Sequence, residues 1–122
     1  MRTKFNNAYN VFLCEMASFP PQLTGLKKRI YFSIDPKTKH NHVRFKYEIE
    51  PDNLVPFIIR GGAITNIAIE LVDPKNQYHK KITATELTDI AKFIQMNIVP
   101  IIQHWNNKIS SYELGQIIKG LK

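Results

Sequence analysis

Two histidines stand two residues apart in the segment KHNHVRF, just before a run of strand-forming residues. In an extended strand, His40 and His42 project from the same face, with their Cβ atoms about 6.5 to 7 Å apart. Two imidazoles at that spacing can share a metal ion, but a zinc or iron site needs a third protein ligand. The available residues are Asp35, Glu70 and His79. Because none of these three has a diagnostic spacing, the histidine pair is a weak candidate metal site, and we expect no cofactor.

The histidines share their predicted strand face with cationic residues. Arg44 and Lys46 follow His42 at every second position, so the three residues share one face. The preceding strand also has a face with cationic residues. Cations on a sheet face can neutralise phosphates, and an aromatic ring among them can stack on an unpaired base. The competing interpretation is a solvated outer face that is kept charged for solubility. The predicted nucleic-acid-binding residues are Lys27, Arg29, Tyr31, His40, His42, Arg44 and Lys46.

Part of the same face has the composition of a catalytic site. General acid–base cleavage of RNA needs a histidine, a lysine or arginine, and at most a tyrosine near one phosphate. His42, Arg44, Lys46 and Tyr31 satisfy that composition, so a small metal-independent ribonuclease or toxin component is the alternative function. The sequence contains no Gly-x-Ser-x-Gly motif and no phosphate-binding loop. The only cysteine, Cys14, has apolar neighbours and is expected to be a buried small hydrophobe.

Length and charge limit the class of protein. A chain of 122 residues is long enough for one domain, residues 1–122, and short for two. The formal net charge of +7 favours anionic partners, either nucleic acid or an acidic protein. No apolar run approaches the roughly 20 residues that a membrane span requires. Asparagines interrupt the apolar pattern near the N-terminus, which is unlike a secretory signal, so we expect a cytoplasmic protein without a membrane partner.

The elements that must position these residues follow from the hydrophobic periodicity. Apolar residues at helical spacing predict a helix over residues 4–18, with a strand over 8–16 as the alternative. The period then changes to two in KKRIYFSI and in residues 40–50, so two strands should form a hairpin around Pro36–Lys39. Matching the apolar faces predicts that Phe32 lies opposite Val43. The same register places Ile30 opposite Phe45, Tyr31 opposite Arg44, Arg29 opposite Lys46 and Ser33 opposite His42.

Further elements are expected after Pro51. Residues 54–59 should form an edge strand or a single helical turn because Pro56 lacks an N–H. A strand is predicted over residues 63–72, after a tight turn at Gly61 and Gly62. Capping-box signatures at Thr83 and Ser110 predict a long helix that Pro100 kinks or splits, and a short helix over residues 111–119. The long helix should cover the sheet with an apolar stripe that ends at Trp105.

The hairpin and the last helix together resemble a small bacterial family of unknown function. In that family, a strand that begins R-I leads into a turn and the motif H-x-H-V, and a C-terminal helix ends with an aromatic residue. The match covers Arg29, Ile30, His40, His42, Val43 and, loosely, Trp105, with KTK in place of the family's paired prolines. The genes of this family often lie in toxin–antitoxin-like pairs. The resemblance therefore implies a protein partner and, beyond it, RNA or DNA.

The sequence thus predicts an α+β domain in which an antiparallel sheet of three to four strands packs against a kinked C-terminal helix, with an N-terminal helix. The expected function is that of a non-enzymatic binding module that presents the basic hairpin face to nucleic acid or to an acidic protein. The ribonuclease is the alternative, and a structural subunit of a protein complex is the second alternative. Oligomeric state, and the choice between DNA and RNA, stay open.

Overall fold

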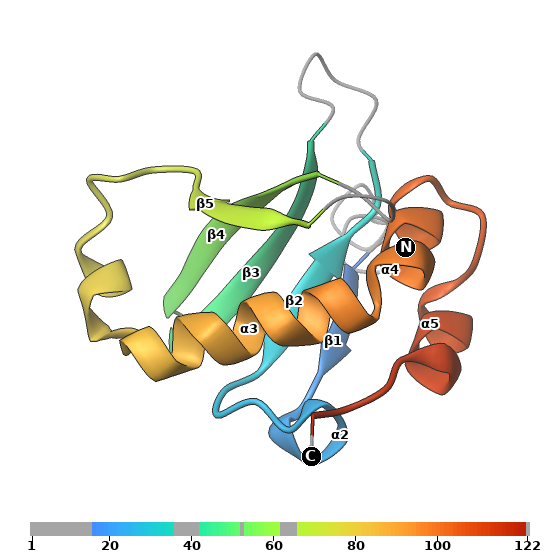
Figure 1. Cartoon of the computed structure of the whole chain (residues 1–122), viewed down its shortest axis with the longest axis horizontal. Coiled ribbons are helices and arrows are strands. Elements are labelled where there is room, and N and C mark those ends of the chain that lie inside the picture. The colour runs from blue at the N-terminus through green and yellow to red at the C-terminus, as the bar shows by residue number, and fades with distance from the viewer. Residues whose placement is uncertain (1–15, 36–41, 52, 62–65, 122) are drawn as a thin grey trace, which may run out of the picture.

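A computed structural model describes residues 16–35, 42–51, 53–61 and 66–121 of the chain. The fold is α+β, with one five-stranded antiparallel sheet whose strands lie side by side in chain order. Helix α3 crosses one face of this sheet, while α4 and α5 continue past β2 and β1 (Figure 1). The strands are β1 (Met16–Phe19), β2 (Ile30–Ser33), β3 (Val43–Glu50), β4 (Asn53–Arg60) and β5 (Ala68–Leu71). The helices are α2 (Pro21–Thr24), the 3-10 helix η1 (Gln77–Lys81), α3 (Ala84–Met96), α4 (Ile98–Trp105) and α5 (Ser111–Ile117).

The α+β class and the antiparallel sheet are confirmed, but the sheet has five strands instead of three to four. One of the additional strands is β1, where the sequence predicted the end of a helix. Ala17 and Phe19 are buried while Ser18 between them is exposed, and β1 pairs along its whole length with β2. The helix prediction is therefore wrong for residues 16–18. This segment pairs with β2 and buries only one side, which favours a strand, because successive side chains of a strand point to opposite faces. Residues 4–15 of that prediction lie outside the described part.

The predicted hairpin of β2 and β3 is confirmed, but its register differs from the prediction by two residues. Ile30 pairs with Tyr47, and Phe32 pairs with Phe45. A shift of two residues keeps every side chain on its predicted face, so the hydrophobic pattern alone does not distinguish the two registers. The turn around Pro36–Lys39 lies outside the described residues.

Charge explains the observed register of the hairpin. The predicted register would place Arg29 directly opposite Lys46, and like charges at opposite positions of a sheet are destabilising. Instead, the Glu48 N–H donates to the Arg29 carbonyl over 3.0 Å, which places these opposite charges across from each other. Tyr31 consequently pairs with Lys46, not with Arg44 as predicted.

The strand predicted for residues 54–59 is confirmed as β4, but it lies inside the sheet and is neither an edge strand nor a helical turn. Its Pro56 is tolerated because of the direction that its backbone faces. The Pro56 carbonyl accepts from the N–H of Val72 over 3.2 Å, so the proline nitrogen also faces the β5 side. On that side, the proline nitrogen faces the chain just beyond Leu71. Because Leu71 is the last residue of β5, no further hydrogen bond of the sheet is required at this position. The missing donor therefore costs no bond to β3.

The helical predictions after residue 82 are confirmed in outline. Thr83 and Glu86 form the capping box that starts α3, and Ser110 and Glu113 form the one that starts α5. The long helix is split at Asn97, three residues before Pro100, which leaves α3 and α4 as separate helices. The predicted isoleucine stripe, Ile90, Ile94, Ile98 and Ile101, is buried in one cluster with the apolar face of the sheet.

Two buried polar groups connect the helices to the rest of the fold. The hydroxyl of Tyr47 on β3 donates to Glu86 Oε2 on α3 over 2.8 Å. The side chain of Asn97 donates to the carbonyls of Phe93 and Lys119 and accepts from the N–H of Lys119. In the described part of the chain, no helix is long and apolar enough to cross a membrane.

Candidate functional site

We call the sheet face opposite α3 the outer face. The predicted alternation of the hairpin is confirmed there, because Tyr31, Arg44 and Lys46 are half-buried on this face while their neighbours in the strands point into the core. Across the sheet, Arg44 pairs with Ile58 and Lys46 pairs with Pro56. The outer face therefore combines cations and one aromatic ring from the hairpin with a half-buried apolar stripe from β4: Leu54, Pro56 and Ile58.

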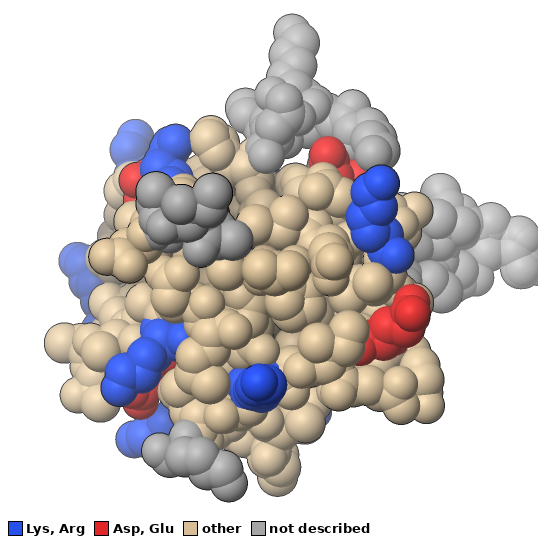
Figure 2. Space-filling view, turned by 45° about the vertical axis from the view of Figure 1, so that its right-hand side comes forward, with Lys and Arg blue, Asp and Glu red and all other residues tan. Residues whose placement is uncertain are grey.

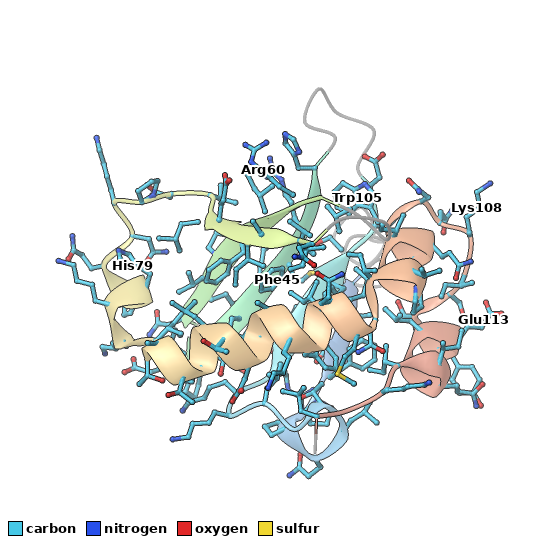
Figure 3. All side chains as sticks on the ribbon, viewed as in Figure 1. Phe45, Arg60, His79, Trp105, Lys108 and Glu113 are labelled. Carbon is cyan, nitrogen blue, oxygen red and sulfur yellow. The ribbon has the colours of Figure 1, made fainter. Side chains whose placement is uncertain are left out.

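A hollow of about 180 Å³ is lined in part by Arg44 and Lys46. Its lining includes Ser33 and Ile34 from the end of β2, Pro56 from β4, and Trp105 from the end of α4. Trp105 is buried, but it stands apart from the main core cluster in which the sequence placed it. The N–H of Asp35 donates to the carbonyl of Trp105 over 2.8 Å, which fixes the end of α4 against the end of β2. Trp105 lies at that end of the molecule in Figure 3.

Two of the predicted binding cations are not available on the outer face, because Arg29 is already hydrogen-bonded and Lys27 lies elsewhere. Arg29 donates to the hydroxyl of Ser18 over 2.7 Å and lies across from Glu48. Lys27 precedes β2 in a bend, and its charge acts on Glu86 of α3, so it does not belong with the outer face. The basic face is therefore smaller than predicted, because the register brings an acidic residue into it.

The histidines contribute little to this cluster. His42 is exposed at the start of β3, where its Nε2 lies 3.4 Å from Nη1 of Arg60. Arg60, labelled in Figure 3, also forms an ion pair of 2.8 Å with Glu70 on β5. His40 lies outside the described residues, so the predicted pair is not seen together. Among the residues that the structure describes, no group of three metal-ligating side chains occurs.

Arg44 and Lys46 differ from these cations. Neither has a hydrogen bond or ion pair to another residue in the described ranges. Lys46 lies directly opposite Tyr31, whose hydroxyl donates to Glu48 Oε1 over 3.4 Å. Burial and the Glu48 carboxylate raise the pKa of Tyr31 above its usual value, so the ring stays neutral at physiological pH. The outer face thus offers two cations, unpaired within the described part of the chain, next to a neutral aromatic ring.

The ribonuclease composition does not converge on one point. His42 and Lys46 are four residues apart along the same strand, which separates them by about 13 Å. Tyr31 lies opposite Lys46, and its hydroxyl is directed toward Glu48, farther from His42. One phosphate cannot contact side chains so distributed without rearrangement. A raised pKa also makes Tyr31 a weaker general acid.

Several residues of this site were missed by sequence reasoning. Ser33 and Pro56 line the hollow, Glu48 reduces the charge of the face, and Arg60 bonds to a predicted site residue. The period of two already placed Ser33 and Glu48 on the polar face, but the strand pairing of β4 was needed for the others.

On the side that brings α4 and α5 forward, the visible lysines and arginines are scattered around a wide uncharged area (Figure 2).

No protein-family model, no curated protein and no solved structure matches this chain. The similarity to the H-x-H-V family therefore stays a prediction from the sequence.

Proposed function

We propose that the protein is a binding module whose outer face contacts single-stranded nucleic acid. The observation that carries this proposal is the group of Arg44, Lys46 and Tyr31 beside the hollow near Trp105. Arg44 and Lys46 contact two phosphates of one strand, because side chains two residues apart on a strand face are separated by about 6.5 to 7 Å. The neutral ring of Tyr31 stacks on an unpaired base. In the cytoplasm, the compartment that we expect for this protein, RNA is an abundant ligand of this kind.

The two unpaired cations also set the expected salt dependence. A protein that neutralises two phosphates of a single strand should show a slope of about −1.4 for log K against log salt concentration. A face with all four predicted lysines and arginines engaged would show a steeper slope, of about −2.8. The remaining affinity comes from stacking on Tyr31, which contributes roughly 1–3 kcal/mol per base in other proteins.

The experiment is a fluorescence anisotropy titration with labelled oligouridine and oligothymidine of about ten nucleotides, a length within the site sizes of such modules. The double variant Arg44→Ala/Lys46→Ala should lose most of the binding and nearly all of the salt dependence. The matched control is Lys92→Ala/Lys108→Ala, which removes the same charge from exposed residues outside the outer face and should bind like the original protein.

Three results would contradict the proposal. One is binding that both double variants weaken equally, because it would follow net charge alone. Another is the absence of any binding at low salt. The third is preferential binding of a polyglutamate peptide that Arg44→Ala/Lys46→Ala abolishes, which would make the ligand an acidic protein. No observation in the described residues favours the ribonuclease or the structural subunit over this module.

A further inference from the structure

Among the described residues, the side of β5 that faces away from β4 is an open hydrogen-bonding edge, because β5 is the last strand of the sheet. The direction of its backbone groups follows from two contacts. The N–H of Val72 faces β4 and donates to the Pro56 carbonyl, whereas the N–H of Ile67 faces away from β4 and donates to Gln95 Oε1 on α3 over 2.8 Å. Since backbone groups alternate along an antiparallel strand, the N–H and C=O groups of Ile69 and Leu71 also face away from β4.

An apolar groove of about 510 Å³ lies directly beneath this edge, between β5, η1 and α3. The side chains of Ile69 and Leu71 form one wall, with Phe57 of β4 behind them. Leu87 and Ala91 of α3 form part of the opposite wall. The groove is lined in part by His79 and the hollow by Trp105, and these two residues lie well apart in Figure 3. It is therefore separate from the proposed nucleic-acid face.

The open edge of β5 and the apolar groove suit the same kind of ligand. Ile69 and Leu71 present backbone donors and acceptors that no described residue pairs to one side, and apolar side chains to the groove. A ligand that uses both must have a strand-like backbone and apolar side chains at every second position. We propose that an extended segment of a partner protein, with apolar residues at alternate positions, binds here as a sixth strand along β5.

A second copy of this chain fits the edge less well. Antiparallel pairing of two β5 strands with Ile69 opposite Leu71 of the other copy would place the two Glu70 residues directly opposite each other. Like charges at opposite positions are destabilising. Gln95 also occupies the Ile67 end of the edge, which leaves the short stretch of Ile69 and Leu71 open among the described residues. Such a stretch suits a short peptide segment better than a long intermolecular sheet.

The probe is a labelled synthetic peptide in which valine and threonine alternate. A control peptide has the same side chains, but its amides on the hydrogen-bonding side are N-methylated, which removes the donors. We expect saturable binding of the first peptide and no binding of the second. On binding, amide exchange at Ile69 and Leu71, followed by NMR, should slow about tenfold or more because both N–H groups become protected.

Two variants of α3 test whether the peptide binds in the groove. Leu87→Gln replaces a groove residue and should weaken peptide binding about tenfold, since it removes one buried leucine contact. Met96→Gln makes a similar change at an exposed position outside the groove and should leave the affinity within about twofold. Leu87 and Met96 are both substantially exposed, so neither variant should unfold the protein.

Each other outcome overturns the proposal. The groove has no peptide function if the probe peptide does not bind, or if both α3 variants bind it alike. Equal binding of the methylated peptide would show a simple apolar pocket without strand addition. If Ile69 and Leu71 are already protected in the free protein, with a protection that grows with protein concentration, the edge binds a second copy.

Discussion

Replacing Tyr47 by phenylalanine tests how the sheet is joined to α3. Tyr47 is fully buried on β3, and its hydroxyl is the only hydrogen-bond donor to Glu86 Oε2 in the described residues. The other oxygen of Glu86 keeps its contacts with the backbone and hydroxyl of Thr83. The variant Tyr47→Phe therefore removes one hydroxyl group and leaves one oxygen of a buried carboxylate without a partner.

The cost follows from the charge and the burial of Glu86, which is 9% exposed. A hydrogen bond to a charged group contributes about 1.5–3 kcal/mol, and loss of one partner leaves the desolvation penalty of the other in place. We expect Tyr47→Phe to lower the free energy of unfolding by about 2 kcal/mol at pH 7. In a domain of this size, that corresponds to a fall of roughly 7 °C in Tm.

The same contact has a pH signature. Burial alone would raise the pKa of Glu86, but hydrogen bonds from Thr83 and Tyr47, with the charge of Lys27, hold that pKa below its usual value of 4.5. A carboxyl whose pKa is lowered on folding adds stability above pH 4.5, and this stability is lost as the pH falls through the folded-state pKa. Because Tyr47→Phe removes part of the lowering, its destabilisation should shrink between pH 7 and pH 4.

Urea unfolding of both proteins at pH 7, 5.5 and 4 measures the effect. Tyr31→Phe is the matched control, because it removes the same group from a longer contact of 3.4 Å on the half-exposed outer face. That control should change stability by less than about 0.5 kcal/mol. A loss for Tyr47→Phe no larger than for Tyr31→Phe, or a loss that stays constant between pH 7 and pH 4, would show that the hydrogen bond to Glu86 does not stabilise the fold in this way.

Three other substitutions test separate parts of the fold. Asn97→Ala should lower the free energy of unfolding by about 2–3 kcal/mol and speed amide exchange at Lys119, because it leaves the Lys119 N–H and C=O unpaired. Gly61→Ala should cost about 1–2 kcal/mol in urea unfolding, since φ is +92° and the added Cβ would lie 2.6 Å from the Asn66 carbonyl oxygen. Burial lowers the pKa of His104 from 6.5. Stability should therefore be constant above pH 6.5 with respect to this residue and fall below it, because the unfolded chain binds the proton more tightly; His104→Gln should remove that dependence from the unfolding free energy.

Sequence periodicity predicted the faces of the hairpin but not its pairing. Ile30, Phe32 and Phe45 are buried as the period of two required. The register was wrong by two residues because such a shift preserves the faces, and the prediction weighed apolar contacts without the like-charge contact of Arg29 with Lys46. A capping box is a local signal, so the starts of α3 and α5 were predicted correctly. Helical spacing in a short N-terminal stretch was not decisive, and Met16–Phe19 became a strand through its contacts with β2.

The candidate site was predicted in part, again because the alternation of side chains along a strand determines which of them share a face. Tyr31, Arg44 and Lys46 share the outer face because they belong to two strands with clear alternation. Trp105 is buried as the apolar stripe required, but helical spacing does not show that α4 ends beside the end of β2. The division of the long helix near Pro100 was predicted, but the inner position of β4 was not evident without the tertiary pairing. The groove beneath β5 likewise joins segments that are far apart in the sequence.

The outer face is tested most directly by following the backbone amide signals of the protein in two-dimensional NMR while single-stranded oligouridine is added. We expect saturable shifts at Tyr31, Ser33, Arg44 and Lys46, with Ile69 and Leu71 unchanged. Shifts confined to the β5 groove, or shifts spread over all exposed lysines without saturation, would contradict this expectation.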